Sequence, residues 1–225
     1  MDNNEVNHIF RKFGNVKALV IGDAMVDSYL RGRVDRISPE APIPIIAVNK
    51  QECRLGGAAN VSLNLQVLGA TPFLVAMVGD DSQGDTFMEL MKKRGLSEEG
   101  IIRTSKRRTT LKTRILSGSQ QVVRVDEEVS DYIQPEEEEI VYSRVVSLMD
   151  SNDFDILIFV DYDKGVITPN LIKRITKLAR AKGIKIAVDP KFRNFKKYNG
   201  VDLFKPNFNE FKKGIGKNIE KQNWV

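Results

Sequence analysis

The chain contains 225 residues, of which 41% are hydrophobic and 29% are charged, a balance typical of one globular domain with a buried core. The net charge of +5 comes from scattered lysines and arginines, so the sequence lacks the basic helix or basic-aromatic surface of a nucleic-acid-binding protein. His8 is the only histidine and Cys53 the only cysteine, which excludes a histidine-cluster zinc site and an internal disulfide.

The chain also shows no targeting or membrane signal. Its N-terminus, MDNNEVNHIFRKF, is polar, and no run of about 18 apolar residues occurs. A lone cysteine suits a reducing compartment. We therefore expect a cytoplasmic protein with neither a membrane nor a nucleic acid as partner.

Five apolar runs end at acidic residues, at glycine or at a Pro-Asn pair. Continuous aliphatic runs are typical of parallel strands that are buried on both faces. Ligands of open parallel sheets bind beyond the carboxyl ends of the strands, so the acidic residues after these runs predict an active-site edge. The runs are residues 18–23 (ALVIGD), 73–81 (FLVAMVGDD), 156–163 (ILIFVDYD), 184–191 (IKIAVDPK) and 201–207 (VDLFKPN).

Helical patterns separate these runs. Residues 55–68 and 83–94 have helical spacing and are each followed by glycine, and residues 170–182 repeat this pattern. Residues 135–149 begin with proline and four glutamates, which could form a cation site but more simply complement the dipole of a helix N-terminus. The alternation of strands and helices predicts an α/β protein with a parallel sheet.

Two further segments predict a small β-layer that stands off the main sheet. Residues 30–48 contain three prolines, which suit edge strands and turns. Residues 109–126 read as two strands joined by a turn at 117–120.

Two short segments contain candidate ligand-binding groups. Gly56 and Gly57 precede a predicted helix, where glycines let backbone N–H groups approach a ligand, and Asn60 adds an amide. Asp23 and Asp27 follow the first strand and could accept hydrogen bonds from sugar hydroxyls. A plain helix entry and turn or cap chemistry explain the same residues without a ligand. Neither a GxGxxG nor a GxxxxGK[ST] phosphate loop is present.

Charged residues also follow the later strands. The segments DYDKG (161–165) and DPK (189–191) place carboxylates and lysines at two strand ends. A surface ion pair would explain either segment alone, but the repetition favours a binding function. Asn207 and Glu210 form an Asn-x-x-Glu pair that could order water around Mg²⁺.

Together these segments resemble the ribokinase-like (PfkB) carbohydrate kinases over about residues 16–212. GDAMVDSY, RISPEAPIPI, GGAANV, QQVVRVDEE, DYDKG, VDPK and KPNFNE are most similar to the kinase domain of the bacterial D-glycero-D-manno-heptose-7-phosphate kinases, the kinase part of ADP-heptose synthase. The resemblance implies one ribokinase-like domain over residues 1–225, a three-layer α/β/α sandwich with a mostly parallel sheet. It also implies a small β-lid, at about 30–49 and 109–126, through which two copies form a homodimer.

The resemblance further implies ATP- and Mg²⁺-dependent phosphorylation of the heptose 7-phosphate at its anomeric hydroxyl, for ADP-heptose and lipopolysaccharide core synthesis. The residues implied to hold the sugar are Asp27, Gly56, Gly57 and Asn60. Further candidate contacts to this substrate, including its phosphate, are Arg33, Arg36, Lys112, Arg114, Gln121, Arg124, Asp161 and Lys164. The residues implied on the nucleotide and Mg²⁺-phosphate side are Asp189, Lys191, Asn207 and Glu210, with Glu210 reaching the metal through water.

The sequence departs from the family in one motif. The family's GxGD, whose amides form an anion hole and whose aspartate is the catalytic base, does not occur, so no catalytic base is assigned. The resemblance then predicts a truncated chain or gene, or a second piece that supplies the rest. Two alternatives to an active heptose kinase stay open: a silent sugar-phosphate-binding or dimerising fragment, and a kinase for another sugar. The adenylyltransferase activity of bifunctional relatives is not expected.

Overall fold

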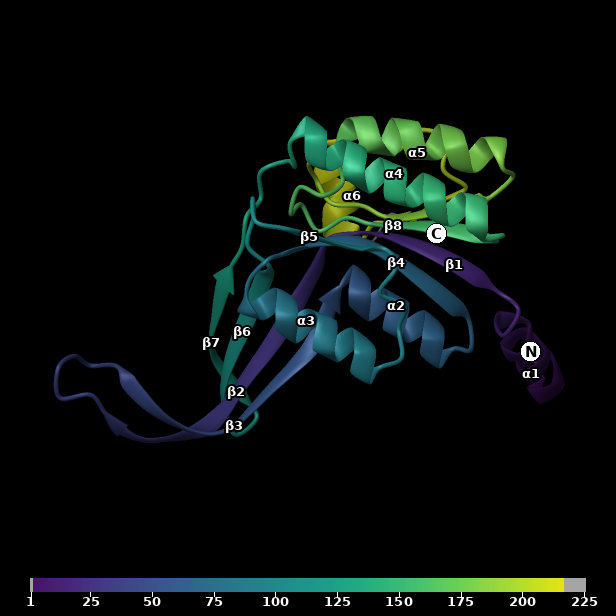
Figure 1. Cartoon of the computed structure of the whole chain (residues 1–225). Helices are drawn as coiled ribbons and strands as arrows, with labels where there is room; N and C mark the ends of the chain where they lie inside the picture. The colour runs from purple at the N-terminus through teal and green to yellow at the C-terminus, as the bar shows by residue number, and fades with distance from the viewer. Residues whose placement is uncertain (1, 217–225) are drawn as a thin grey trace.

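A computed structural model describes residues 2–216, which form two sheets and flanking helices (Figure 1). In the main sheet six parallel strands follow the order β10 (Leu203–Phe204), β9 (Lys185–Asp189), β8 (Ile156–Val160), β1 (Lys17–Gly22), β4 (Thr71–Gly79) and β5 (Ile101–Thr104). The second sheet, which we call the lid, has the order β3 (Pro44–Gly57), β2 (Ala24–Ile37), β6 (Thr110–Ser117) and β7 (Gln120–Glu127).

Helices cover both faces of the main sheet. In Figure 1, α2 (Ala58–Val67) and α3 (Ser82–Lys93) lie below it, and α4 (Pro135–Ser151) and α5 (Pro169–Ala181) lie above it. A short α6 (Phe208–Ile215) follows the edge strand β10, and α1 (Asn3–Phe13) precedes β1. The predicted three-layer α/β/α sandwich with a parallel sheet is confirmed.

The core consists of two apolar clusters, one on each face of the main sheet. Leu19 and Ile21 of β1 pack toward the cluster that contains α4 and α5, whereas Val20 packs toward the α2 and α3 side. These three side chains are buried because β1 is an interior strand covered on both faces. Burial on both faces explains why the strands read as continuous apolar runs in the sequence.

The lid is longer than the sequence patterns indicate. Strand β2 begins two residues after β1 ends, and β3 runs directly into α2, so the paired strands span residues 24–57 instead of only 30–49. The three prolines at positions 39, 42 and 44 fall in the turn and at its edge, where a missing N–H costs no ladder bond. Residues 55–57, expected to open a helix, instead finish β3.

The sequence patterns did not predict the shortest helices and strands. Strand β5 has four residues, and β10 has two in place of the seven-residue run that suggested it. Helices α1 and α6 were not expected either, although capping boxes at Asp2 and Glu5 and at Asn207 and Glu210 begin them. Short segments contain too few apolar positions to establish a period.

Asp23 joins the main sheet to the loop that follows β8. It lies between β1 and β2, is 1% exposed, and accepts hydrogen bonds from the backbone N–H groups of Tyr162 (2.8 Å), Lys164 (3.0 Å) and Val166 (3.1 Å). Burial raises the pKa of the Asp23 carboxyl, and these hydrogen bonds oppose that rise. Asp23 therefore has a structural role, the turn-chemistry alternative considered for it from the sequence.

Among residues 2–216, no helix combines the length and the apolar composition that crossing a bilayer requires.

The three hydrogen bonds to Asp23 predict a large loss of stability when its carboxylate is removed. Asp23→Ala leaves three N–H groups without their acceptor and should lower the free energy of unfolding by about 3 kcal/mol or more. Urea denaturation measures this loss. Asp155→Ala is the matched control, because exposed Asp155 accepts a single N–H, from Lys17 (2.8 Å) at the other end of β1. Equal losses in the two variants would contradict the assigned role.

Candidate functional site

Two pockets contain residues that the sequence patterns singled out. The first, the lid pocket, has a volume of about 400 Å³ and is lined by Asp27, Tyr29, Glu52, Cys53, Arg54, Leu55, Asn60, Leu63, Leu90 and Arg94. The second, the α6 pocket, has a volume of about 510 Å³ and is lined by Asp163, Lys191, Phe192, Asn207, Phe208, Asn209, Glu210 and Lys213. The sequence-predicted residues distribute between these two pockets and the lid.

The lid pocket brings together the residues of the GDAMVD and GGAAN segments. Asp27 on β2 is 19% exposed at its side chain and accepts a hydrogen bond from Arg114 on β6. A Cβ atom on Gly56 would lie 2.6 Å from Oδ2 of Asp27, so only glycine leaves room for this carboxylate. Gly57 has φ +58° and approaches the backbone of Asp23, and exposed Asn60 lies in the first turn of α2.

The cations and amide predicted on the lid occupy different environments. Lys112 on β6 is enclosed by Asp126 (2.9 Å) and Glu128 (2.8 Å), which neutralise it. Arg124 on β7 is half exposed and pairs with Asp126 at 2.9 Å, and Gln121 is exposed on the same strand. These three side chains do not line the lid pocket.

Arg33 and Arg36 lie still farther out. Both are exposed on the distal half of β2, six and nine residues beyond Asp27. At the usual rise of a strand these separations correspond to roughly 20 and 30 Å. The structure therefore does not bring either arginine to the lid pocket of the same chain.

Asp161 forms the centre of a buried polar network. It is 1% exposed, and its Oδ2 accepts hydrogen bonds from Asn194 (3.0 Å) and Tyr198 (2.6 Å). Asn194 in turn accepts a hydrogen bond from Tyr132 (2.9 Å). Burial, followed by the charge of Asp161, raises the pKa of the Tyr198 hydroxyl. Asp161 thus holds the loops after β8 and β9 together, and it lines neither pocket.

Lys164 connects this loop to the lid. Its ammonium donates to Glu128 (2.8 Å), which also accepts from Lys112 (2.8 Å). Burial by itself would raise the pKa of the Glu128 carboxyl, but the two lysines outweigh it and leave that pKa below its usual value. Glu128 is therefore a charged bridge between β6 and the loop after β8.

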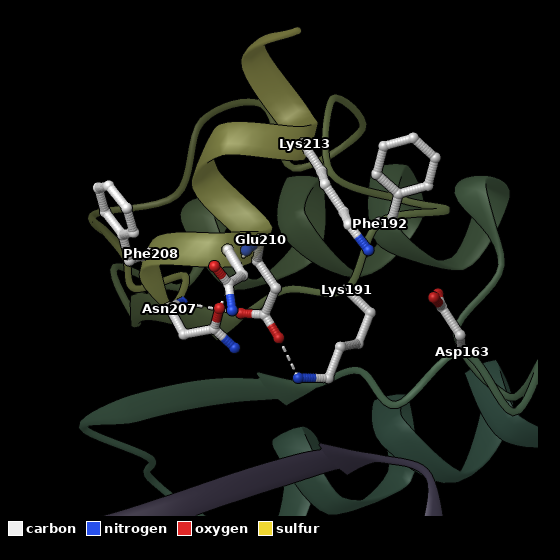
Figure 2. Close-up of a pocket in the computed structure, with 8 residues that line it drawn as sticks. Asp163, Lys191, Phe192, Asn207, Phe208, Glu210 and Lys213 are labelled. Atoms are coloured by element: carbon white, nitrogen blue, oxygen red, sulfur yellow. Dashed lines mark hydrogen bonds and ion pairs between the residues drawn. The ribbon is translucent and has the colours of Figure 1, made fainter. Parts of the chain in front are cut away.

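The α6 pocket contains most of the predicted nucleotide-side residues (Figure 2). Asn207 caps α6 by accepting from the N–H of Glu210 (2.9 Å), and Glu210 accepts from the N–H of Asn207 (2.8 Å). The same Glu210 carboxylate also accepts from Lys191. Asp189 lies outside the pocket and pairs with Lys205 at 3.1 Å.

Asp163 is a pocket residue that the sequence patterns did not single out from its neighbours. It has φ +56°, its side chain lines the α6 pocket with Lys191 and Lys213, and its Oδ1 is buried without a hydrogen-bond partner among the described residues (Figure 2). Burial, and secondarily the nearby Asp161, raises the pKa of this carboxyl. Of the DYDKG residues, Asp163 alone lines this pocket, and its positive φ is not apparent from the sequence.

The carboxylates of the α6 pocket suit a cation that keeps most of its water better than a cation coordinated mainly by protein side chains. Within residues 2–216, no group of three or more acidic, histidine or cysteine side chains is arranged to enclose a metal. The carboxylates of Asp163 and Glu210 face the same pocket and are the oxygen ligands that Mg²⁺ accepts while it keeps most of its water.

The comparisons with known proteins agree on one family. The sequence model described as pfkB family carbohydrate kinase matches residues 16–224. The bifunctional protein HldE of Citrifermentans bemidjiense is 38% identical over 210 residues, which are 93% of this chain and 43% of that protein. HldE of Pelobacter propionicus is 39% identical over 216 residues, covering 96% and 44%. The chain thus spans less than half the length of these curated relatives.

Solved structures share the fold at lower identity. Phosphofructokinase-2 from Escherichia coli in complex with substrates and products matches with a TM-score of 0.70 and 16% identity, over 92% of this chain and 64% of that one. A carbohydrate kinase from Agrobacterium tumefaciens matches with a TM-score of 0.67 and 21% identity, over 89% and 64%.

The Glu128 bridge predicts how the lid is held to the main domain. Glu128→Gln removes both ion pairs and should speed backbone amide exchange in β6 and β7 by about fivefold, measured by hydrogen-exchange mass spectrometry. Because the pKa of Glu128 is lowered by folding, its contribution is complete above the usual glutamate value of about 4.3 and is lost as pH falls through the lower folded-state value. As a control, Glu139→Gln breaks an ion pair between Glu139 on α4 and Arg174 on α5, away from the lid. This variant should leave amide exchange in the lid unchanged. Unchanged lid exchange in Glu128→Gln would contradict the bridge.

Proposed function

Because this chain belongs to the pfkB family of carbohydrate kinases, which are phosphotransferases, we propose that its lid pocket binds a sugar phosphate and its α6 pocket binds phosphate groups of ATP with Mg²⁺. The reaction is transfer of the terminal phosphoryl group to a sugar hydroxyl in the cytoplasm, where ATP is available. The observation that carries this proposal is that Asp27 and Asn60 line one pocket at the base of the lid, with Gly56 packed against the Asp27 carboxylate.

The chemistry of the lid pocket supports sugar binding. An ionised carboxylate only accepts hydrogen bonds, so Asp27 can accept from two neighbouring hydroxyls and fix the orientation of the ring. Asn60 both donates and accepts, which suits a hydroxyl that does the same. Gly56 keeps the Asp27 carboxylate free of a Cβ clash, and Arg114 holds it from the other side.

The α6 pocket supports the phosphate side of the same reaction. Phosphoryl transfer depends mainly on positioning and on stabilisation of the phosphate charge. Lys191 and Lys213 supply positive charge, and Lys191 is oriented by Glu210. Asp163 and Glu210 would hold Mg²⁺ through its water, and the ion would supply positive charge to the phosphate oxygens.

We propose D-glycero-D-manno-heptose 7-phosphate as the substrate and its anomeric hydroxyl as the acceptor. The RISPEAP and GGAAN segments support this choice over ribose or fructose phosphate. The product would serve ADP-heptose synthesis. The competing function is sugar-phosphate binding without turnover, since the 225 residues contain no GxGD motif.

Binding and turnover of the full chain test these proposals. We expect calorimetry to detect heptose 7-phosphate, and Asp27→Asn to weaken its binding by about tenfold or more, because a charged acceptor is lost. ATP consumption with heptose 7-phosphate and Mg²⁺ should fall between about 1 and 100 s⁻¹ for a competent kinase.

The outcomes separate the two functions. Heptose 7-phosphate binding without ATP consumption would contradict the kinase and favour the silent binding module. Unchanged affinity in Asp27→Asn, with its fold verified by circular dichroism, would remove Asp27 from the sugar site. Turnover of ribose or fructose phosphate at a higher rate would reassign the substrate.

We also propose that two copies associate through the lid. The face of the lid opposite to Asp27 carries an apolar depression of about 420 Å³, lined by Leu30, Pro44, Ile46, Val48, Ile115, Val122 and Val123. Val48 is 51% exposed and Val123 is 46% exposed, an unusual exposure for a contiguous set of aliphatic side chains. A second lid of the same chain would bury both sets at once in a two-fold arrangement.

A charge on this face should prevent association. Val123→Glu should convert a dimer to a monomer in sedimentation analysis, because dimer formation would then bury an unpaired carboxylate. Ile140→Glu is the matched control, since Ile140 is 51% exposed on α4, away from the lid. A monomeric parent chain, or a dimer that tolerates Val123→Glu, would contradict the lid interface.

A further inference from the structure

Tyr162 contacts residues of both pockets, although it lines neither of them. It is the second residue after β8, and β8 lies in the sheet between β1, which leads into the lid, and β9, which leads to Lys191. The backbone N–H of Tyr162 donates to the buried carboxylate of Asp23 (2.8 Å). This hydrogen bond fixes the backbone of Tyr162 at the carboxyl end of the main sheet.

The ring of Tyr162 lies at the junction of the two pockets. It packs against the apolar cluster to which Leu55, Leu63 and Leu90 of the lid pocket also belong. The Nζ atom of Lys191, which lines the α6 pocket, lies 5.2 Å from the centroid of the same ring. A cation at this distance from a tyrosine ring is attracted to it, so Lys191 and the ring hold each other in place.

Charged groups of both pockets act on the Tyr162 hydroxyl. Burial and, next, the charge of Asp189 raise its pKa. Lys191 lowers this pKa, whereas Asp27 of the lid pocket and Glu210 of the α6 pocket raise it further. Because the effect of a charge falls with distance, the hydroxyl lies near the carboxylates of both pockets.

The Tyr162 hydroxyl is available to a ligand. Within the part of the chain that the structure describes, this hydroxyl forms no hydrogen bond, and the Tyr162 side chain is partly exposed. A phenol donates one hydrogen bond without carrying charge, which suits an anionic acceptor such as a phosphate oxygen.

We infer that Tyr162 binds the terminal phosphate of the nucleotide, with its hydroxyl donating a hydrogen bond to an oxygen of that phosphate. Phosphoryl transfer requires the terminal phosphate and the acceptor hydroxyl to be in contact. With the sugar in the lid pocket and the nucleotide phosphates in the α6 pocket, these two groups meet at the junction where Tyr162 lies. This inference rests on the proposed function of the two pockets and adds a residue that positions the transferred group.

The test compares two nucleotides on the full chain. Calorimetry measures Mg²⁺-ADP and the Mg²⁺ complex of an ATP analogue whose terminal phosphate is joined through nitrogen, which prevents hydrolysis. Tyr162→Phe keeps the ring, its apolar packing and its contact with Lys191, and it removes only the hydroxyl. We expect this variant to lose about tenfold in affinity for the ATP analogue, because a hydrogen bond to a charged acceptor is lost, and to bind ADP unchanged.

The matched control is Tyr142→Phe. Tyr142 lies on α4 and also faces a cation, with the guanidinium carbon of Arg174 3.7 Å from its ring centroid. It packs against the apolar cluster on the opposite face of the main sheet from Tyr162. We expect unchanged affinity for both nucleotides in this variant. Equal losses for the two nucleotides in Tyr162→Phe, or no loss for either, would overturn the inference.

A separate probe distinguishes this inference from the proposed function. If the parent chain binds neither nucleotide, inorganic triphosphate with Mg²⁺ is titrated into the chain labelled with fluorotyrosine, and fluorine NMR follows the signal that disappears in Tyr162→Phe. A saturable shift of this signal, absent for Tyr142, would support the phosphate contact and contradict only the nucleotide. An unchanged Tyr162 signal, or equal shifts of both signals, would contradict the contact itself.

Discussion

The loop after β8 supplies Asp163 to the α6 pocket and Lys164 to the Glu128 bridge, and it is held by two charged side chains, Asp23 and Arg107. Asp23 accepts from the N–H groups of Tyr162, Lys164 and Val166, while Arg107 donates to the carbonyl oxygen of Lys164. Burial lowers the pKa of the Arg107 guanidinium, and the charge of Asp23 opposes that change. A buried carboxylate is costly unless donors surround it, so the loop and Asp23 require each other.

This loop contacts the lid on one side and the segment after β9 on the other. Toward the lid, Lys164 shares Glu128 with Lys112 of β6. Toward β9, Asp161 is bound by Asn194 and Tyr198, which follow the DPK segment. Asp163, between these two contacts, lines the α6 pocket. A single five-residue segment thus sets the position of the lid, of the segment after β9 and of a pocket carboxylate.

The sequence predicted the strands that are buried on both faces, and it missed the shortest strands and helices. Interior strands such as β1 are covered on both faces, which leaves a continuous apolar run that can be read directly. Strand β5 has only four residues at an edge, so no period is established.

The candidate site was predicted to the level of segments and less well to the level of atoms. DYDKG was predicted to be a charged segment at a strand end. Within it Asp161, and not Asp163, is the buried aspartate. Asn194 and Tyr198, more than 30 residues away in the sequence, bury it by hydrogen bonding to its carboxylate. Likewise, the lid arginines expected near the substrate phosphate were Arg33, Arg36, Arg114 and Arg124, yet of these four Arg114 alone contacts Asp27, which follows from the β2–β6 register. Both distinctions come from long-range contacts that a local pattern does not contain.

The way in which the lid is attached restricts how it can move. One residue, Asp23, separates β1 from β2, and β3 runs into α2 without any intervening residue, so neither connection contains a loop. The register of these two strands is interrupted between Arg31 and Gly32 and again between Val34 and Arg36. Bulges are the points where paired strands bend. The strands that carry Asp27 therefore continue from the core without a loop, and the bends of the lid lie beyond Arg31.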